Sequence, residues 1–300
     1  MRRESNPLLI KELRGRMRGA RAFIVLTVYL LLLTCFTSIV YYAYQIDVTG
    51  YGGRADMAEL GKTAFATVVL VEIFMVTFIT PAFTAGAISG ERERKTYELL
   101  RATLLPARKL VSGKLTSALT YMFLLILAAV PLESLAFILG GVVVEELGMA
   151  LVLLLVTAFA FAAIGLFFSS LARTTLVSTV LTYATALLTT IGLPLLLFML
   201  VLLLDPVLMG YGSSSPSWIV EAGLMYGAIF LSSLSPLATA VVTKIFLEEE
   251  NAILYYWYEI DSAHRIPVPS AWIVYAVFYV GLALALLLAT VLRVRLQESE

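Results

Sequence analysis

Long apolar runs, separated by short polar segments, set the pattern of this chain. About 20 consecutive apolar residues cross the bilayer hydrocarbon as a helix, and six of the runs reach that length. In the fifth run, Gly192 and Pro194 predict a kink. The pattern predicts an all-α membrane protein, with residues 1–300 forming a single transmembrane domain. The six predicted transmembrane helices are residues 22–44, 63–88, 115–139, 149–168, 176–204 and 271–292.

The segment before the first span is basic and amphipathic. Leu9, Leu13 and Met17 recur every four residues, so they share one face of a helix. A basic amphipathic helix beside a span lies in the headgroup plane, with its apolar face toward the acyl chains. We therefore predict an interfacial helix over residues 1–21 that contacts membrane lipid. The alternative is a basic flank that only sets the topology.

Residues 205–270 are harder to assign, because serines and a proline break their apolar run at 223–246. A seventh span there would place the two termini on opposite sides of the membrane. With six spans, 17 of the 21 Lys and Arg residues fall on one face, which satisfies the positive-inside rule. We therefore predict a multi-pass protein of the cell (inner) membrane with both termini in the cytoplasm. Residues 205–270 are then external, and 223–246 is a re-entrant or interfacial segment held against protein.

The amino-acid composition supports a membrane protein and excludes several kinds of chemical site. Of the 300 residues, 60% are hydrophobic and only 14% are charged, whereas soluble domains have about 25% charged residues. The chain has one cysteine, Cys35, and one histidine, His264. It therefore cannot form an intrachain disulfide or a metal site built from several cysteines or histidines. No catalytic constellation is evident, and the net charge of zero gives no sign of a nucleic-acid partner. We expect no catalytic residues, no metal or cofactor bound by this chain, and no nucleic acid.

Two carboxylates, Glu72 and Glu133, lie inside predicted spans. A charged group in the hydrocarbon is expensive, so such residues are candidates for a functional role. They could relay protons or bind a substrate. Alternatively, each is hydrogen-bonded within a bundle or a subunit interface, or Glu133 reaches the outer headgroups. No Lys or Arg lies in the same spans to pair with them.

Residues 89–114 form the one long polar loop with dense charge of both signs, between the second and third predicted spans. Glu91 and Glu93 suit the first turn of a helix, and Tyr97, Leu100 and Leu104 then recur at helical spacing. The loop is therefore predicted to contain a short amphipathic helix that ends at the following proline. The exposed apolar face of this helix is expected to be buried against another surface. That surface is either the chain's own N-terminal helix and lipid headgroups, or the groove of a partner protein.

The run TAGAISGERERKTYELLRATLLPARKLVSGKL resembles the loop between the second and third spans of ABC type-2 transporter permeases, whose usual wording is close to GERERGTLELLLATPL followed by a basic residue and GK. The opening NPLLIKELRGRMRG is similar to the N-terminal interfacial helix of the same family. The span count and the broken segment before the last span also agree, so the resemblance covers nearly the whole chain. Lys95 and Tyr97 stand where Gly and Leu are more usual.

The resemblance implies a permease subunit that couples ATP hydrolysis on a separate nucleotide-binding ATPase subunit to export. ATP and magnesium would bind to that partner, and a second permease copy or a paralogue would complete a dimer. The residues that would dock on the ATPase, as a coupling helix, are Glu91, Arg92, Glu93, Arg94, Lys95, Thr96, Tyr97, Glu98, Leu99, Leu100 and Thr103. Two alternatives are an ion-coupled secondary transporter that uses Glu72, and a membrane protein that serves only docking or assembly.

Overall fold

The computed structural model describes residues 20–51, 57–96, 106–208, 218–250, 253–261 and 264–299. These residues are mostly helical, and six helices among them are long and apolar enough to cross a membrane. The predicted fold class is therefore confirmed. The interfacial helix is predicted over residues 1–21, of which 1–19 lie outside the described residues and 20–21 begin the first described helix. Residues 97–105 of the central loop also lie outside the described residues. The chain divides into two compact units, residues 1–184 with 280–300 and residues 185–279.

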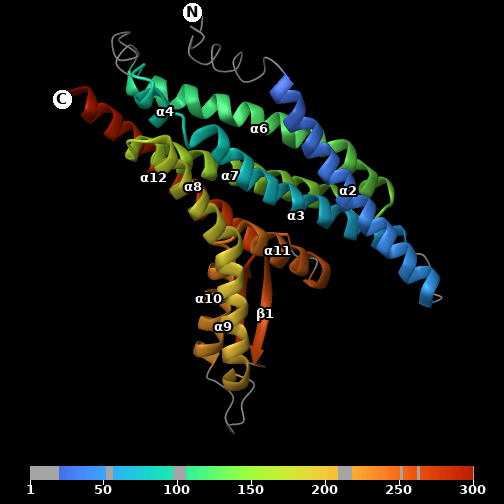
Figure 1. Ribbon diagram of the computed structural model, residues 1–300. Coiled ribbons are helices and arrows are strands. Elements are labelled where there is room, and N and C mark those ends of the chain that lie inside the picture. Colours follow the sequence, from blue (N-terminus) through green and yellow to red (C-terminus); the bar gives the residue numbers. More distant parts are fainter. Residues whose placement is uncertain are drawn as a thin grey trace, which may run out of the picture. The chain divides into compact units, whose positions relative to one another are not determined.

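The first unit is a bundle of long helices in which α3 is central. Helix α3 (Met57–Thr84) packs against α2 (Ala20–Tyr51), α6 (Ala107–Ile138) and α7 (Val144–Leu171), as Figure 1 shows. The ten residues that begin α8 (Thr175–Leu187) and the end of α12 (Ala271–Ser299) belong to the same unit. Each of the four long helices begins before the apolar run that predicts it, because a helix continues into the polar residues that flank a span. Helix α3 ends at Thr84, four residues before the predicted end of the second span.

Small residues let α3 approach its neighbours closely at both ends. A Cβ added to Gly165 of α7 would lie 2.1 Å from the hydroxyl oxygen of Thr84, at the end of α3. A Cβ added to Gly141, in the link between α6 and α7, would lie 2.0 Å from the carbonyl oxygen of Ala58, at the start of α3. Close approach at small residues drives helix association in membranes, where there is no hydrophobic force between apolar faces. These two contacts therefore help to fix the position of α3 in the bundle.

The second unit contains the interrupted part of the fifth candidate span. A π-helical turn, η1 (Leu188–Gly192), separates α8 from α9 (Leu193–Leu208). Pro194 has no N–H, so it cannot donate to the carbonyl of Thr190 as an α-helix would require. π-Helical turns and prolines are two common causes of kinks. The helix is thus irregular where Gly192 and Pro194 predict it.

Residues 223–246 fall within two short helices of the second unit, α10 (Trp218–Ser232) and α11 (Pro236–Glu250). Each has 15 residues, fewer than the 17 or so that a spanning helix needs. The break between them lies at the serine-rich turn, and the Ser233 hydroxyl donates a hydrogen bond of 3.1 Å to the carbonyl oxygen of Ala271. This link connects the turn to the start of α12.

A β-hairpin follows α11, and no strand is predicted there. Strands β1 (Tyr255–Asp261) and β2 (His264–Pro269) pair antiparallel, with Tyr255 opposite Pro269. An exposed ion pair of 2.5 Å joins Arg265 to Glu259 across the strands. The Tyr226 hydroxyl of α10 donates a hydrogen bond of 2.7 Å to the carbonyl oxygen of Pro267. The hairpin is therefore packed on α10 within the second unit.

Candidate functional site

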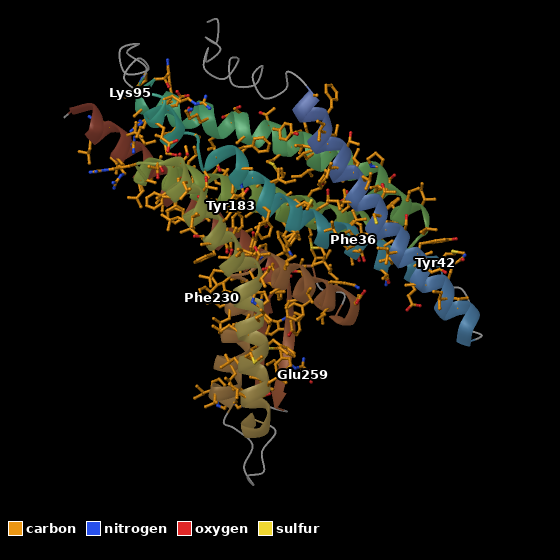
Figure 2. The ribbon with its side chains drawn as sticks, in the orientation of Figure 1. Phe36, Tyr42, Lys95, Tyr183, Phe230 and Glu259 are labelled. Atoms are coloured by element: carbon orange, nitrogen blue, oxygen red, sulfur yellow. The ribbon has the colours of Figure 1, made fainter. Side chains whose placement is uncertain are left out.

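The central loop begins with a tight turn rather than a long helix. After α3 the chain turns at residues 85–88 and forms α4 (Ser89–Glu93), which has only five residues. Lys95 has a φ of 57°, in the left-handed region that ends helices. The helix predicted to start at Glu91 is therefore interrupted at Lys95. Lys95 lies beside α4 at one end of the bundle, whereas Phe36 and Tyr42 lie further along α2 (Figure 2).

A serine at the end of α7 holds the first residues of this turn. The Ser169 hydroxyl oxygen accepts hydrogen bonds from the backbone N–H groups of Ile88, at 2.8 Å, and Ser89, at 3.0 Å. Ser89 and Ser169 are both fully buried. Backbone N–H groups at the start of a helix have no partner within it, and a side-chain oxygen commonly satisfies them. Ser169 therefore does this from a different helix.

Glu93 connects α4 to the start of α8. One carboxylate oxygen of Glu93 accepts a hydrogen bond of 2.9 Å from the Thr175 backbone N–H, and the other accepts one of 2.7 Å from the Thr175 hydroxyl. A carboxylate at a helix N-terminus also interacts favourably with the helix dipole. Thr175 is the first residue of α8. Glu93 thus caps α8 from outside it.

Glu91 and Arg92 contact two further helix ends. Glu91 accepts a hydrogen bond from the Thr96 hydroxyl and forms an ion pair of 3.5 Å with Lys114 of α6. The Lys114 side chain is only 3% exposed, and that of Glu91 is 28% exposed. Arg92 donates a hydrogen bond of 3.2 Å to the carbonyl oxygen of Ala172, just after α7. The loop is thereby joined to α6 and α7 as well as α8.

We call this set of contacts the loop clasp. It consists of Ser89, Glu91, Arg92 and Glu93 on the loop, and Lys114, Ser169, Ala172 and Thr175 on the bundle. The same part of the bundle contains a cluster of buried apolar residues. Its members are Ile88, Ala107, Leu110, Val111, Leu166 and Val294. The polar contacts and the apolar cluster together attach the start of the loop to the ends of α6, α7 and α8.

Among the predicted docking residues that the structure describes, some contact the bundle. Glu91, Arg92 and Glu93 contact the protein's own helices. Arg94 and Lys95 are exposed, and Thr96 is half-buried. The predicted residues Tyr97, Glu98, Leu99, Leu100 and Thr103 lie outside the described residues.

Sequence reasoning missed the bundle side of the loop clasp. None of Ser169, Ala172 and Thr175 is among the candidate residues that the sequence gives. One signal was available there, because two serines and two threonines close together after a long apolar run often cap helix ends. Their partners lie about 80 positions earlier in the chain, and no local pattern links the two segments.

The two intramembrane carboxylates come together in the bundle. Glu72 of α3 is 0% exposed and Glu133 of α6 is 2% exposed. The Tyr29 hydroxyl of α2 donates a hydrogen bond of 2.6 Å to Oε1 of Glu72. The Glu133 carboxyl lies close enough to that of Glu72 for the two to interact electrostatically. Three helices thus contribute one polar side chain each to a buried cluster, which we call the acid cluster.

No group of three or more His, Cys, Asp or Glu residues that could hold a metal ion occurs within the described ranges. The acid cluster has two carboxyls and a phenol, fewer oxygen ligands than the six to eight typical of calcium sites. Two carboxyls and a phenol are groups that can form hydrogen bonds and exchange protons.

Comparison with known proteins gives a family for most of the chain. The family model described as ABC-2 family transporter protein matches residues 7–244. The match includes α2 to α10, most of α11 and the whole central loop, and it ends before the hairpin and α12. A comparison with curated proteins finds no match.

Proposed function

The chain belongs to the ABC-2 family of transporter proteins, and from that premise we propose that it is the permease subunit of an ATP-driven exporter. A member of this family is a transmembrane subunit of an ABC transporter that works with an ABC ATPase subunit. The finer proposal concerns how this chain receives the movement of that ATPase, and in which direction it transports.

The proposed docking element is the part of the central loop beyond Thr96. Its sequence includes the apolar residues Leu99 and Leu100, and it directly follows the exposed charges of Arg94 and Lys95. An amphipathic helix of this kind binds by placing its apolar face in a hydrophobic groove. ATP and magnesium are held by the partner subunit, and this chain contributes no catalytic residue.

The loop clasp is the observation that carries the proposal. A loop that moved independently of the spans could bind a partner but could not move them. Here Glu93 is bonded to the start of α8, Ser169 holds the turn to the end of α7, and Glu91 pairs with Lys114 of α6. A displacement of the loop is therefore passed to three helix ends at once.

The remaining features of the proposal follow the predicted topology. The loop clasp, like both termini, lies on the cytoplasmic face of a cell (inner) membrane. Two copies of the chain, or this chain and a paralogue, form the transport path between them, and residues 1–21 lie along the lipid headgroups. Export is the direction proposed.

The test is co-purification with an ATPase subunit. The chain is expressed together with the ABC ATPase encoded near it, extracted in mild detergent and purified through a tag on the permease. We expect the ATPase to be retained by the unmodified chain. We expect it to be lost from a double variant, Leu99→Asp with Leu100→Asp, because two carboxylates would have to be buried unpaired in the groove.

The matched control is Leu296→Asp. Leu296 is 67% exposed near the end of α12, so the same substitution there introduces a charge without touching the proposed docking element. The control should retain the ATPase. Docking through residues 97–103 is contradicted if the double variant still retains the ATPase in full, or if the unmodified chain never does.

A further inference from the structure

The acid cluster has more hydrogen-bond acceptors than donors. Tyr29 supplies one O–H, which is used by Oε1 of Glu72. Oε2 of Glu72 and both carboxyl oxygens of Glu133 are buried and have no hydrogen-bond partner of good geometry among the described residues. Buried polar atoms are almost always hydrogen-bonded. These three carboxyl oxygens therefore need a donor.

No basic side chain of the described helices around the cluster supplies this donor. The groups that act most strongly on Glu72 are Tyr29 from α2 and Glu133 from α6. The remaining neighbour, α7, has its ionisable side chains, Glu145 and Glu146, in its first turn. At the start of α3, Glu59 and Lys62 are exposed. Within the described bundle the cluster is thus a pair of carboxyls and a phenol, without a compensating cation.

Two adjacent carboxylates out of water cannot both keep a negative charge. Each buried charge costs several kcal/mol, and like charges at contact repel one another. One proton placed on either carboxyl removes one charge and provides the missing O–H donor. A proton also fits the packing, because the side chains are 0% and 2% exposed and leave no surface of the pair open to a larger ligand.

We propose that Tyr29, Glu72 and Glu133 form an intramembrane proton-binding site. One proton, taken up from water, forms an O–H bond with an oxygen of one carboxyl and donates a hydrogen bond to the other. The shared proton joins α6 to α3, and the Tyr29 hydroxyl joins α2 to α3. Nothing else in the site changes oxidation state or bonding. This site goes beyond the proposed function, and its test needs no ATPase.

The experiment is infrared spectroscopy of the purified full chain in detergent. A protonated carboxyl has a C=O stretching band that a carboxylate lacks, and the band shifts on exchange into D₂O. Free glutamic acid is protonated only below about pH 4.3. We expect the unmodified chain to show this band at neutral pH, and the double variant Glu72→Gln with Glu133→Gln to lack it.

The matched control is the double variant Glu59→Gln with Glu145→Gln. Both of these side chains are exposed, one on α3 and one on α7, so the control should keep the band. Tyr29→Phe should also keep the band but shift it, because a hydrogen bond to Glu72 is removed. These variants separate the acid cluster from other carboxyls of the chain.

Three outcomes overturn the proposal. The first is that the unmodified chain has no protonated-carboxyl band at neutral pH. The second is that the band survives in the Glu72–Glu133 double variant. The third is that the band appears only after sodium and potassium are removed, which would make the pair a cation site instead. If the double variant does not fold, the unmodified chain alone still decides the first and third outcomes.

Discussion

The Glu93 carboxylate accepts two hydrogen bonds from Thr175, one from its backbone N–H at 2.9 Å and one from its hydroxyl at 2.7 Å. The two residues are 82 positions apart, at the end of α4 and the start of α8. Because both carboxylate oxygens are engaged by one residue, α4 and α8 meet end to end with a defined geometry. In the function proposed above, this contact is part of the route by which movement of the loop reaches the bundle.

Ser169→Ala should destabilise the protein. The substitution leaves the N–H groups of Ile88 and Ser89 without their acceptor in a buried position, and an unsatisfied buried donor costs about 1–3 kcal/mol. The thermal unfolding temperature in detergent measures the effect. The control is Ser170→Ala, because the Ser170 hydroxyl donates its hydrogen bond to the carbonyl of Phe167 in its own helix. If both variants unfold at the same temperature, the role assigned to Ser169 is wrong.

Gly165→Ala should weaken the contact between α3 and α7. The new Cβ would meet the Thr84 side chain at 2.1 Å and the backbone nitrogen of Ala85 at 3.2 Å, so the helices must move apart. Overpacking of this kind costs about 1–3 kcal/mol. Gly148→Ala is the control on the same helix, where nothing lies within 4 Å of the new Cβ, and it should be neutral or stabilising. Equal unfolding temperatures for the two variants would contradict this account of the packing.

Tyr226→Phe should loosen the hairpin from α10. The phenol donates a hydrogen bond of 2.7 Å to the Pro267 carbonyl, and losing such a bond costs about 0.5–1.5 kcal/mol. Amide hydrogen exchange of residues 255–269 would report the loosening. Tyr255→Phe is the matched control, since the Tyr255 side chain is 56% exposed. Faster exchange in the control than in Tyr226→Phe would refute the prediction.

The six spans were predictable because a run of about 20 apolar residues is a local property of the sequence. The hairpin was not predicted, although a signal existed. Residues 255–258 are four consecutive aromatic residues, and aromatic residues are enriched in strands.

Contacts within the two candidate sites were beyond prediction from one sequence. Glu72 and Glu133 were each identified as unusual because a carboxyl in a span is costly, but their proximity depends on how α3 and α6 pack. The same holds for Ser169 and Ile88, which belong to distant segments. For Glu91 and Glu93 the assigned role was docking on a partner, whereas the structure adds bonds to Lys114 and Thr175. The unusual character of single residues could be predicted from the sequence, whereas the pairs that these residues form depend on how the helices pack.

The central claim is that the loop clasp passes movement of the loop to the bundle. A measurement that needs no known substrate compares two spin labels within the first unit, in a chain whose Cys35 is replaced by alanine. Leu176→Cys on α8 and Ile138→Cys on α6 are suitable positions, since both side chains are over 70% exposed. The distance between the labels is measured by pulsed electron paramagnetic resonance in the complex with the ATPase subunit, without nucleotide and with trapped ATP.

We predict that ATP changes this distance in the chain with Glu93, and that Glu93→Ala abolishes the change while the ATPase stays bound. The Glu145→Ala variant, altered at an exposed acid of α7, should behave like the unmodified chain. An ATP-dependent change that persists undiminished in Glu93→Ala would contradict the claim, because movement would then reach α8 without the bond from Glu93 to Thr175.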